Sequence, residues 1–449
     1  MLEVNIYQTT EEGRSSGDPL FVVGRKLYRI NNAGNPVVAR NEVIIVNEYD
    51  SIDEGRSSGD PLFFAKFKFY KVESGNVFVV KGTLASMMLI MDKNGVVRFA
   101  TRIDPNIQAI VDNPANKAVL YFFNGQWNTA TKSDFFHEAD TDISIADAPR
   151  KWQGAISAPN GKIYGLPRDE DDRNVLVFNP LTEQKTYIPV TGAASLGGVL
   201  APNGKIYAFC NPDQVLLVID TLTDTVEVLS PPGIVSALDT ILAPNGKIYG
   251  MPTTDGIIPI LDPDSDPPQV DSTTITGLPT QSDKWASGVL AKNGKIYGIP
   301  FDNESVLIID PETNTVDITT ITGLIGSQKW IGGVVAPNGK IYGIPASASN
   351  VLIIDPDTNT VDTTSITGLT GSTKWSRGVL GPNELIYGSP FNSSSVLIID
   401  PETNAVDTTT ITGLAGSLKW RNVVVGVDGK IYGIPGNSDF ILRIKPSVV

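Results

Sequence analysis

Hydrophobic and polar residues follow a repeating pattern along the carboxy-terminal two-thirds of the chain. In the unit that begins at Trp330, the apolar run GGVVA leads into Asn338-Gly339 and then into KIYGIP. Asn-Gly between two β-prone runs predicts a two-residue hairpin turn. The run NVLIID ends at Asp355-Pro356, which suits a type I turn, and the polar run TVDTTSI follows. Each unit therefore predicts four short antiparallel strands, which make one propeller blade.

The phrase PNGKIYG and its variants occur seven times. Their inner glycine, or Glu384 in the same place, recurs at steps of 43, 42, 48, 45, 45 and 45 residues, a period typical of propellers. The seventh unit stops at Val449 after its third strand, and residues 140–145 stand where a fourth strand would precede the first unit. We therefore expect an all-β fold in which an upstream strand closes a seven-bladed β-propeller over residues 137–449, because closure removes exposed strand edges.

Residues 1–136 carry a different duplication. The phrase GRSSGDPLF occurs at 13–21 and again at 55–63. Each copy predicts a polar loop that leads into a hairpin, so this part is expected to be a small all-β domain with an internal duplication. Identical loops suit docking onto a protein partner, and a duplication without a separate role is the alternative. The residues expected to attach are Arg14, Asp18, Arg56 and Asp60.

Composition and charge exclude several classes of function. The net charge is −14, and it falls on residues 137–449, which have 20 basic and 34 acidic residues. Binding to nucleic acid needs a basic face, so it is not expected. No apolar run approaches the roughly 20 residues of a membrane-spanning helix, so membrane insertion is not expected either. The amino terminus lacks the basic and apolar regions of a signal peptide, and the single Cys210 cannot form an internal disulfide, so we expect folding in a cytoplasm.

The residues that commonly carry catalysis or bind metal are few. His137 and Cys210 are the single histidine and the single cysteine, so a nucleophilic triad is not expected. Aspartates recur where the third strand of a unit ends, and turn capping explains them. Acidic runs at 168–172 and 262–266 suit either Ca²⁺ or a solvated loop, and neither has a complete calcium-loop pattern. We expect no metal, no cofactor and no enzymatic activity.

Lysine followed by tryptophan recurs where the chain passes from the outer strand of one unit to the inner strand of the next. One interpretation is that each indole wedges between blades as packing. The other is an arc of aromatic platforms, with lysines beside them, that stacks on sugar rings or anchors a partner. The residues expected to bind a ligand are Lys151, Trp152, Lys284, Trp285, Lys329, Trp330, Lys374, Trp375, Lys419 and Trp420.

Units such as SVLIIDPETNTVD, followed by GVVAPNGKIYG, resemble YVTN-type and related PDGK-type β-propeller repeats. The resemblance covers about two-thirds of the chain and implies the fold rather than a function. Streptogramin lyase is a catalytic relative with seven blades, and that resemblance implies an essential histidine. Because His137 lies outside the repeats, a lyase-like enzyme ranks third among the functions considered.

Two function classes remain ahead of it. The first is a non-enzymatic structural protein in the virion of a tailed bacteriophage, a tail, fibre or baseplate component made in the host cytoplasm without a signal peptide. Its partners would be other virion or scaffold proteins within a larger assembly, and its propeller would meet a host-surface glycan or another protein. Two β modules with separate duplications and no catalytic set favour this class. The second class is a free bacterial lectin-like or scaffold propeller.

Overall fold

The computed structural model describes residues 137–145, 152–168, 173–281 and 283–446 in full, together with the strands that precede residue 137. The chain divides into two compact units, Met1–Glu138 with Pro446–Val449, and Ala139–Lys445. Within the described part the regular elements are all strands, which confirms the all-β class. Accordingly, no described helix has the length and apolar character needed to cross a membrane.

The described strands of the first unit form three sheets, and two of these contain the hairpins that follow the duplicated phrase. The hairpin β2–β3 pairs Phe21 with Tyr28, and β6–β7 pairs Phe63 with Tyr70 in the same register, so the sequence duplication is also structural. Arg14, Asp18, Arg56 and Asp60 lie outside the described residues. The sheets, in strand order, are β1 (Asn5–Tyr7), β2 (Leu20–Val23), β3 (Lys26–Ile30) and β4 (Pro36–Val38); β12 (Gln126–Thr129), β11 (Asn116–Phe123), β9 (Met87–Asp92), β10 (Val96–Thr101) and β5 (Ile44–Asn47); and β6 (Leu62–Ala65), β7 (Lys68–Glu73) and β8 (Asn76–Val79).

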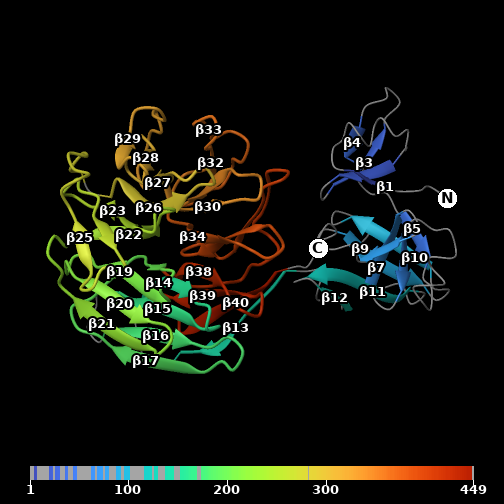
Figure 1. The fold of residues 1–449 in the computed structure, drawn as a ribbon, viewed down its shortest axis with the longest axis horizontal. Helices are drawn as coiled ribbons and strands as arrows, with labels where there is room; N and C mark the ends of the chain where they lie inside the picture. The colour runs from blue at the N-terminus through green and yellow to red at the C-terminus, as the bar shows by residue number, and fades with distance from the viewer. Residues whose placement is uncertain are drawn as a thin grey trace. The chain divides into compact units, whose positions relative to one another are not determined.

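The second unit is a ring of seven four-stranded sheets, which confirms the propeller. In Figure 1 the colour passes around the ring from green through yellow and orange to red. From the innermost strand outward, the first four blades are β14 (Trp152–Ser157), β15 (Ile163–Pro167), β16 (Asn174–Phe178), β17 (Lys185–Pro189); β18 (Val199–Leu200), β19 (Lys205–Phe209), β20 (Leu216–Asp220), β21 (Thr225–Leu229); β22 (Ala237–Leu242), β23 (Ile248–Pro252), β24 (Ile260–Asp262), β25 (Gln269–Asp271); and β26 (Trp285–Leu290), β27 (Ile296–Pro300), β28 (Leu307–Asp310), β29 (Thr315–Asp317). The last three are β30 (Trp330–Val335), β31 (Ile341–Pro345), β32 (Leu352–Asp355), β33 (Thr360–Asp362); β34 (Trp375–Leu380), β35 (Ile386–Pro390), β36 (Leu397–Asp400), β37 (Ala405–Asp407); and β38 (Trp420–Val425), β39 (Ile431–Pro435), β40 (Phe440–Lys445), with β13 (Glu138–Ser144) as the outermost strand.

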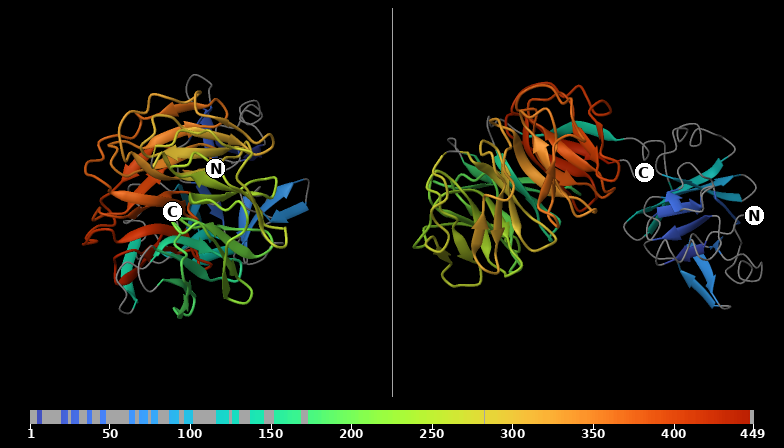
Figure 2. Two further views of the ribbon diagram at one scale, coloured as in Figure 1. Left: turned by 90° about the vertical axis from the view of Figure 1, so that its left-hand side faces the viewer. Right: turned by 90° about the horizontal axis from the view of Figure 1, so that it is seen from above.

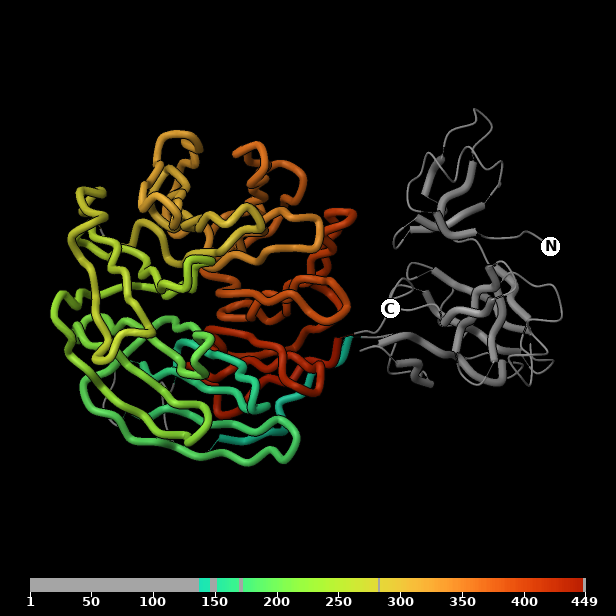
Figure 3. Tube along the Cα trace, viewed as in Figure 1, coloured from blue at the N-terminus to red at the C-terminus, as the bar shows by residue number. Residues whose placement is uncertain are grey.

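The ring is closed by the upstream strand, as the sequence predicts. Strand β13 pairs with β40, so the first strand of the unit completes the blade built by the last three. Teal β13 lies beside the red strands in Figures 1 and 2, and the trace in Figure 3 can be followed from teal to red. Arg443 on β40 stabilises this closure. Its Nε is 2.8 Å from Oδ2 of Asp140 on β13, and its Nη1 is 2.6 Å from Oε1 of Glu183 in blade 1.

The hydrophobic core lies between the blades. One cluster, for example, joins Val289, Tyr297 and Ile299 of blade 4 to Trp330 and Leu352 of blade 5. This arrangement explains why the second and third strands are apolar at nearly every position, since both faces of each sheet are covered by a neighbour. The fourth strands lie at the rim and are polar.

The repeated phrase links each blade to the next. Asn338 caps its own turn by accepting from the backbone of Lys340, and its Nδ2 donates to Tyr342 Oη at 3.1 Å and to the carbonyl of Pro401 in the following blade at 2.8 Å. Tyr342 Oη is 2.9 Å from Oδ1 of Asn404, also in the following blade. The same asparagine contacts recur from Asn160, Asn203, Asn245 and Asn293. PNGKIYG therefore encodes a hairpin and an inter-blade link together.

The aspartates at the ends of the third strands cap turns. Asp310 Oδ1 accepts from the backbone of Glu312 at 3.1 Å, and Asp262 does the same for Asp264 at 3.2 Å. Asp262 in the run 262–266 therefore caps a turn, and over the described ranges no group of three acidic, histidine or cysteine side chains is arranged to hold a metal ion. Residues 169–172 of the other acidic run lie outside the described residues.

Candidate functional site

The Lys–Trp steps lie at one end of the ring, which we call the front face. In an antiparallel blade the first strand begins, the second ends and the third begins at the same end. The front face is therefore built from the loops that lead into each innermost strand and the loops between the second and third strands. The PNGKIYG turns lie at the opposite end.

The five tryptophans of the Lys–Trp steps each begin an innermost strand and are buried, with 0 to 3% of their surface exposed. Each indole Nε1 donates to a main-chain carbonyl at the start of the third strand of its own blade, at 2.7 to 3.0 Å. Trp285 and Trp330 also belong to core clusters that join two blades. The wedge interpretation therefore describes their position, and the rings offer no exposed face for stacking.

The lysines of the last four steps are buried as well, at 0 to 4% exposure: Lys284, Lys329, Lys374 and Lys419. Lys374 Nζ donates to the carbonyls of Ala346 at 2.9 Å and Ala348 at 2.8 Å in blade 5, and to Gly371 at 3.0 Å in its own lead-in loop. A buried ammonium is costly unless its donors are satisfied, and here main-chain oxygens satisfy all three. Each lysine thus connects two blades; Lys151 lies outside the described residues.

Burial also changes the acidity of these ammonium groups. It lowers the pKa of Lys374 and of Lys419 to about 8, because a charged group loses hydration in the core. It lowers the pKa of Lys284 and Lys329 too, although the nearby carboxylates of Asp255 and Asp302, respectively, act in the opposite direction. Ligand binding by the Lys–Trp pairs stays a prediction, and main-chain carbonyls already accept all three ammonium hydrogens of Lys374 and of Lys419.

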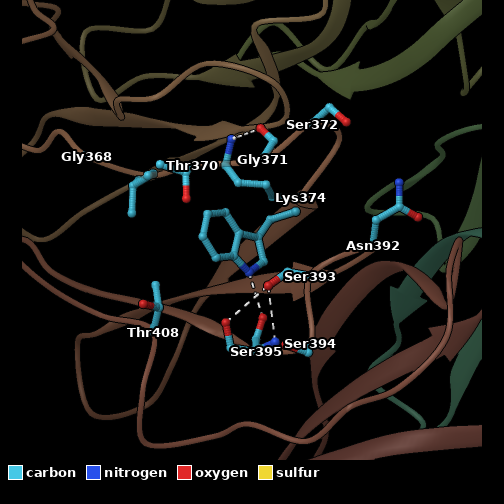
Figure 4. Close-up of a pocket in the computed structure, with 12 residues that line it drawn as sticks. Gly368, Thr370, Gly371, Ser372, Lys374, Asn392, Ser393, Ser394, Ser395 and Thr408 are labelled. Atoms are coloured by element: carbon cyan, nitrogen blue, oxygen red, sulfur yellow. Dashed lines mark hydrogen bonds between the residues drawn. The ribbon is translucent and has the colours of Figure 1, made fainter.

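A pocket of about 350 Å³ opens beside the Lys374–Trp375 step. Its walls come from the loop that leads into β34, from the loop between β35 and β36, and from Thr408 after β37. Figure 4 shows Thr370, Ser393 and Ser394 around the opening. Lys374 is the one charged residue of the lining, and its ammonium is already occupied by carbonyls.

The free polar groups of this pocket are neutral. The hydroxyls of Thr370, Ser372, Ser394 and Thr408 make no hydrogen bond to the described part of the protein, and Thr370, Ser372 and Ser394 are exposed. Ser393 and Ser395 bond to each other at 3.1 Å. Sequence reasoning identified the Trp375 step but missed this serine- and threonine-rich lining. The run NSSS at 392–395 was the available signal, because the corresponding loop of blade 4 contains Asp302 and Glu304.

The middle of the ring holds an ion pair that the sequence did not reveal. Asp239 of blade 3 and Arg377 of blade 6 lie on opposite sides of the ring, and Arg377 Nη1 is 2.8 Å from Oδ2 of Asp239. Gly197 and Gly332 make room for them: a Cβ on Gly197 would stand 1.8 Å from Oδ1 of Asp239, and one on Gly332 3.0 Å from Cα of Arg377. Glycine at these two inner positions is thus explained by this specific pair.

Solved structures share this fold. Streptogramin B lyase matches with a TM-score of 0.57 and 11% identity, over 70% of this chain and 99% of that chain. A catalytically inactive variant of virginiamycin B lyase from Staphylococcus aureus, with quinupristin, matches with a TM-score of 0.58 and 11% identity, over 69% and 99%. A protein described as the extracellular domain of a hybrid two-component system from B. thetaiotaomicron matches with a TM-score of 0.50 and 10% identity, over 95% of this chain and 62% of that one.

The chain is a seven-bladed β-propeller with a distant likeness to the streptogramin B lyase propeller. At these identities the likeness shows the fold alone. No protein-family model matches the sequence, and no curated protein matches it.

Proposed function

We propose that this chain is a non-enzymatic recognition protein whose propeller binds a saccharide in the blade 6 pocket. The observation that carries the proposal is the lining of that pocket, where neutral hydroxyls that bond to nothing in the described part of the protein surround the Lys374–Trp375 step. Sugar hydroxyls need donors and acceptors at fixed places, and serine and threonine supply both. The lysine–carbonyl links hold these loops against the neighbouring blade, which limits the entropy lost on binding.

Binding of neutral sugars, measured by a glycan array and then by calorimetry, tests the proposal. Replacing Thr370 and Ser394 together by alanine removes two hydrogen-bonding groups, so affinity should fall roughly threefold to tenfold per group. Ser349→Ala is the matched control, since Ser349 occupies the position of Ser394 in blade 5. Sugar binding that survives Ser394→Tyr, which fills the opening, would contradict the pocket as the site.

We place this recognition protein in the virion of a tailed bacteriophage, where the first unit would attach to virion or scaffold proteins and the ring would meet a host-surface glycan. The paired hairpins β2–β3 and β6–β7 support attachment, because duplicated surfaces suit equivalent neighbours in an assembly. Mass spectrometry of purified virus particles tests the setting. A protein found free in uninfected bacteria would instead support the lectin-like or scaffold alternative.

A lyase-like activity remains the third candidate. The resemblance to streptogramin lyase implies an essential histidine, and His137, the single histidine, directly precedes β13 at the outer edge of blade 7. Incubation with a streptogramin B antibiotic, followed by mass spectrometry, would reveal a linearised product if this candidate were correct.

A further inference from the structure

Arg421 stands out among the arginines of the ring. It follows Trp420 on β38, at the front face of blade 7, and its side chain is only partly exposed. Its Cζ lies 4.9 Å from the centre of the Phe391 ring, and its Nη1 is 3.3 Å from Oε1 of Gln153 on β14. Its Nε is buried and has no hydrogen-bond partner in the part of the chain that the structure describes. The guanidinium is therefore held in place by an aromatic face and an amide.

The charge of Arg421 is not balanced by a carboxylate within the described ranges. Three other arginines of the ring have one: Arg173 pairs with Asp213 at 2.7 Å, Arg377 with Asp239 at 2.8 Å, and Arg443 with Asp140 at 2.8 Å. For Arg421 no ion pair occurs over residues 137–145, 152–168, 173–281 and 283–446. A second positive charge is near instead, since Arg168 follows β15 in blade 1 and repels Arg421.

This arrangement is unfavourable for a cation. Burial and the charge of Arg168 together lower the pKa of Arg421 to about 10, which still leaves the guanidinium charged at neutral pH. A desolvated positive charge beside another one destabilises the folded protein. An oxyanion within reach of the guanidinium would offset this repulsion, because it attracts the positive charge. Arginine also presents paired N–H groups that match the oxygens of a carboxylate or a phosphate.

We propose that Arg421, with Arg168, forms an anion site on the front face at the junction of blades 1 and 7, which takes a carboxylate or phosphate group of a ligand. The terminal nitrogens of Arg421 bind the oxyanion, Phe391 and Gln153 fix the plane of the guanidinium, and Arg168 adds charge. This site is separate from the hydroxyl-lined pocket of blade 6. It goes beyond neutral saccharide binding, because it selects ligands that carry an acidic group.

Thermal unfolding and calorimetry at constant ionic strength test the site, with inorganic phosphate and glucuronate as probes and chloride and glucose as their matched controls. Phosphate and glucuronate should each raise the melting temperature of the full chain above the chloride and glucose values. Arg421→Gln should weaken both affinities roughly tenfold or more, as expected for loss of a charge-assisted hydrogen bond. Arg421→Lys should retain part of the phosphate affinity, and it serves as the readout should the glutamine variant not fold.

Arg173→Gln is the control, because it removes an arginine that already has a carboxylate, and its response to phosphate should equal that of the native chain. Ser394→Tyr should also keep the phosphate response, so failure of the blade 6 pocket and failure of this site are distinguishable. An unchanged response in Arg421→Gln would overturn the proposal. A response seen only after residues 169–172 are made neutral would overturn it as well, since that acidic run would then be the partner of the arginines.

Discussion

Replacing Trp285 by alanine tests whether the tryptophans act as packing. Trp285 has no exposed surface, and its Nε1 donates to the carbonyl of Ser305 at 2.7 Å. A Trp→Ala change in a core costs about 3 to 5 kcal/mol through lost burial and the cavity left behind. Loss of the indole donor adds about 1 kcal/mol, because the carbonyl of Ser305 then lacks its partner. The free energy of unfolding should therefore fall by about 4 to 6 kcal/mol.

Blade 3 has an alanine at the position that Trp285 occupies in blade 4, and its surroundings show why alanine fits in blade 3 but not in blade 4. Ala237 pairs with Pro252 in the register that Trp285 and Pro300 have in blade 4. Around Gly250 of blade 3 the space is filled by Ala237, Pro259 and Phe209. In blade 4 the indole of Trp285 occupies this space, and no other side chains fill it once the indole is removed. The cavity in Trp285→Ala would thus stay open.

Thermal and urea unfolding measure the loss. For a unit of roughly 300 residues with an unfolding entropy near 2 cal/mol/K per residue, the melting temperature should drop by roughly 7 to 10 °C. Trp285→Phe keeps most of the ring and should lose less than half as much, and Leu181→Ala, at a side chain that is 69% exposed, should change little. A Trp285→Ala protein that melts with the native one would refute the packing argument.

Three further predictions concern the links within the ring. Deleting residues 1–136 should leave a ring that is monodisperse in size-exclusion chromatography. Deleting residues 1–150 also removes β13, and the open edge of β40 should then cause aggregation. Equal solubility of the two shortened proteins would contradict closure of the ring by β13. Asn338→Ala should lower the unfolding free energy by about 1 to 3 kcal/mol, because Tyr342 and the carbonyl of Pro401 lose a donor; an unchanged urea midpoint would show that the link contributes nothing. Burial lowers the pKa of Lys374 from 10.5 to about 8, so between these two pH values the unfolded chain binds more protons than the folded chain. The stability of the native protein should therefore rise with pH over this range when it is compared with Lys374→Met. A difference in melting temperature between the two proteins that stays constant with pH would show that Lys374 does not titrate there.

The sequence by itself determined the blades and their closure. Alternating runs, Asn-Gly and Asp-Pro turns and a period near 45 residues act within one unit, so local patterning was enough to place the strands. The missing fourth strand of the last unit also predicted β13, because an open edge had to be paired. The place of tryptophan at the start of the innermost strands followed from the same period.

Only the tertiary structure decided what the Lys–Trp steps do. Whether an indole or an ammonium is buried depends on the neighbouring blade, and Lys374 finds its carbonyls in residues that lie up to 28 positions away. The Asp239–Arg377 pair joins residues 138 positions apart, and Arg421 meets Gln153 across 268 positions. Such contacts depend on how the ring closes, and a repeat pattern carries no information about which residues face each other across the axis. The pocket of blade 6 arises in the same way, from three loops whose shapes are set by packing rather than by local sequence.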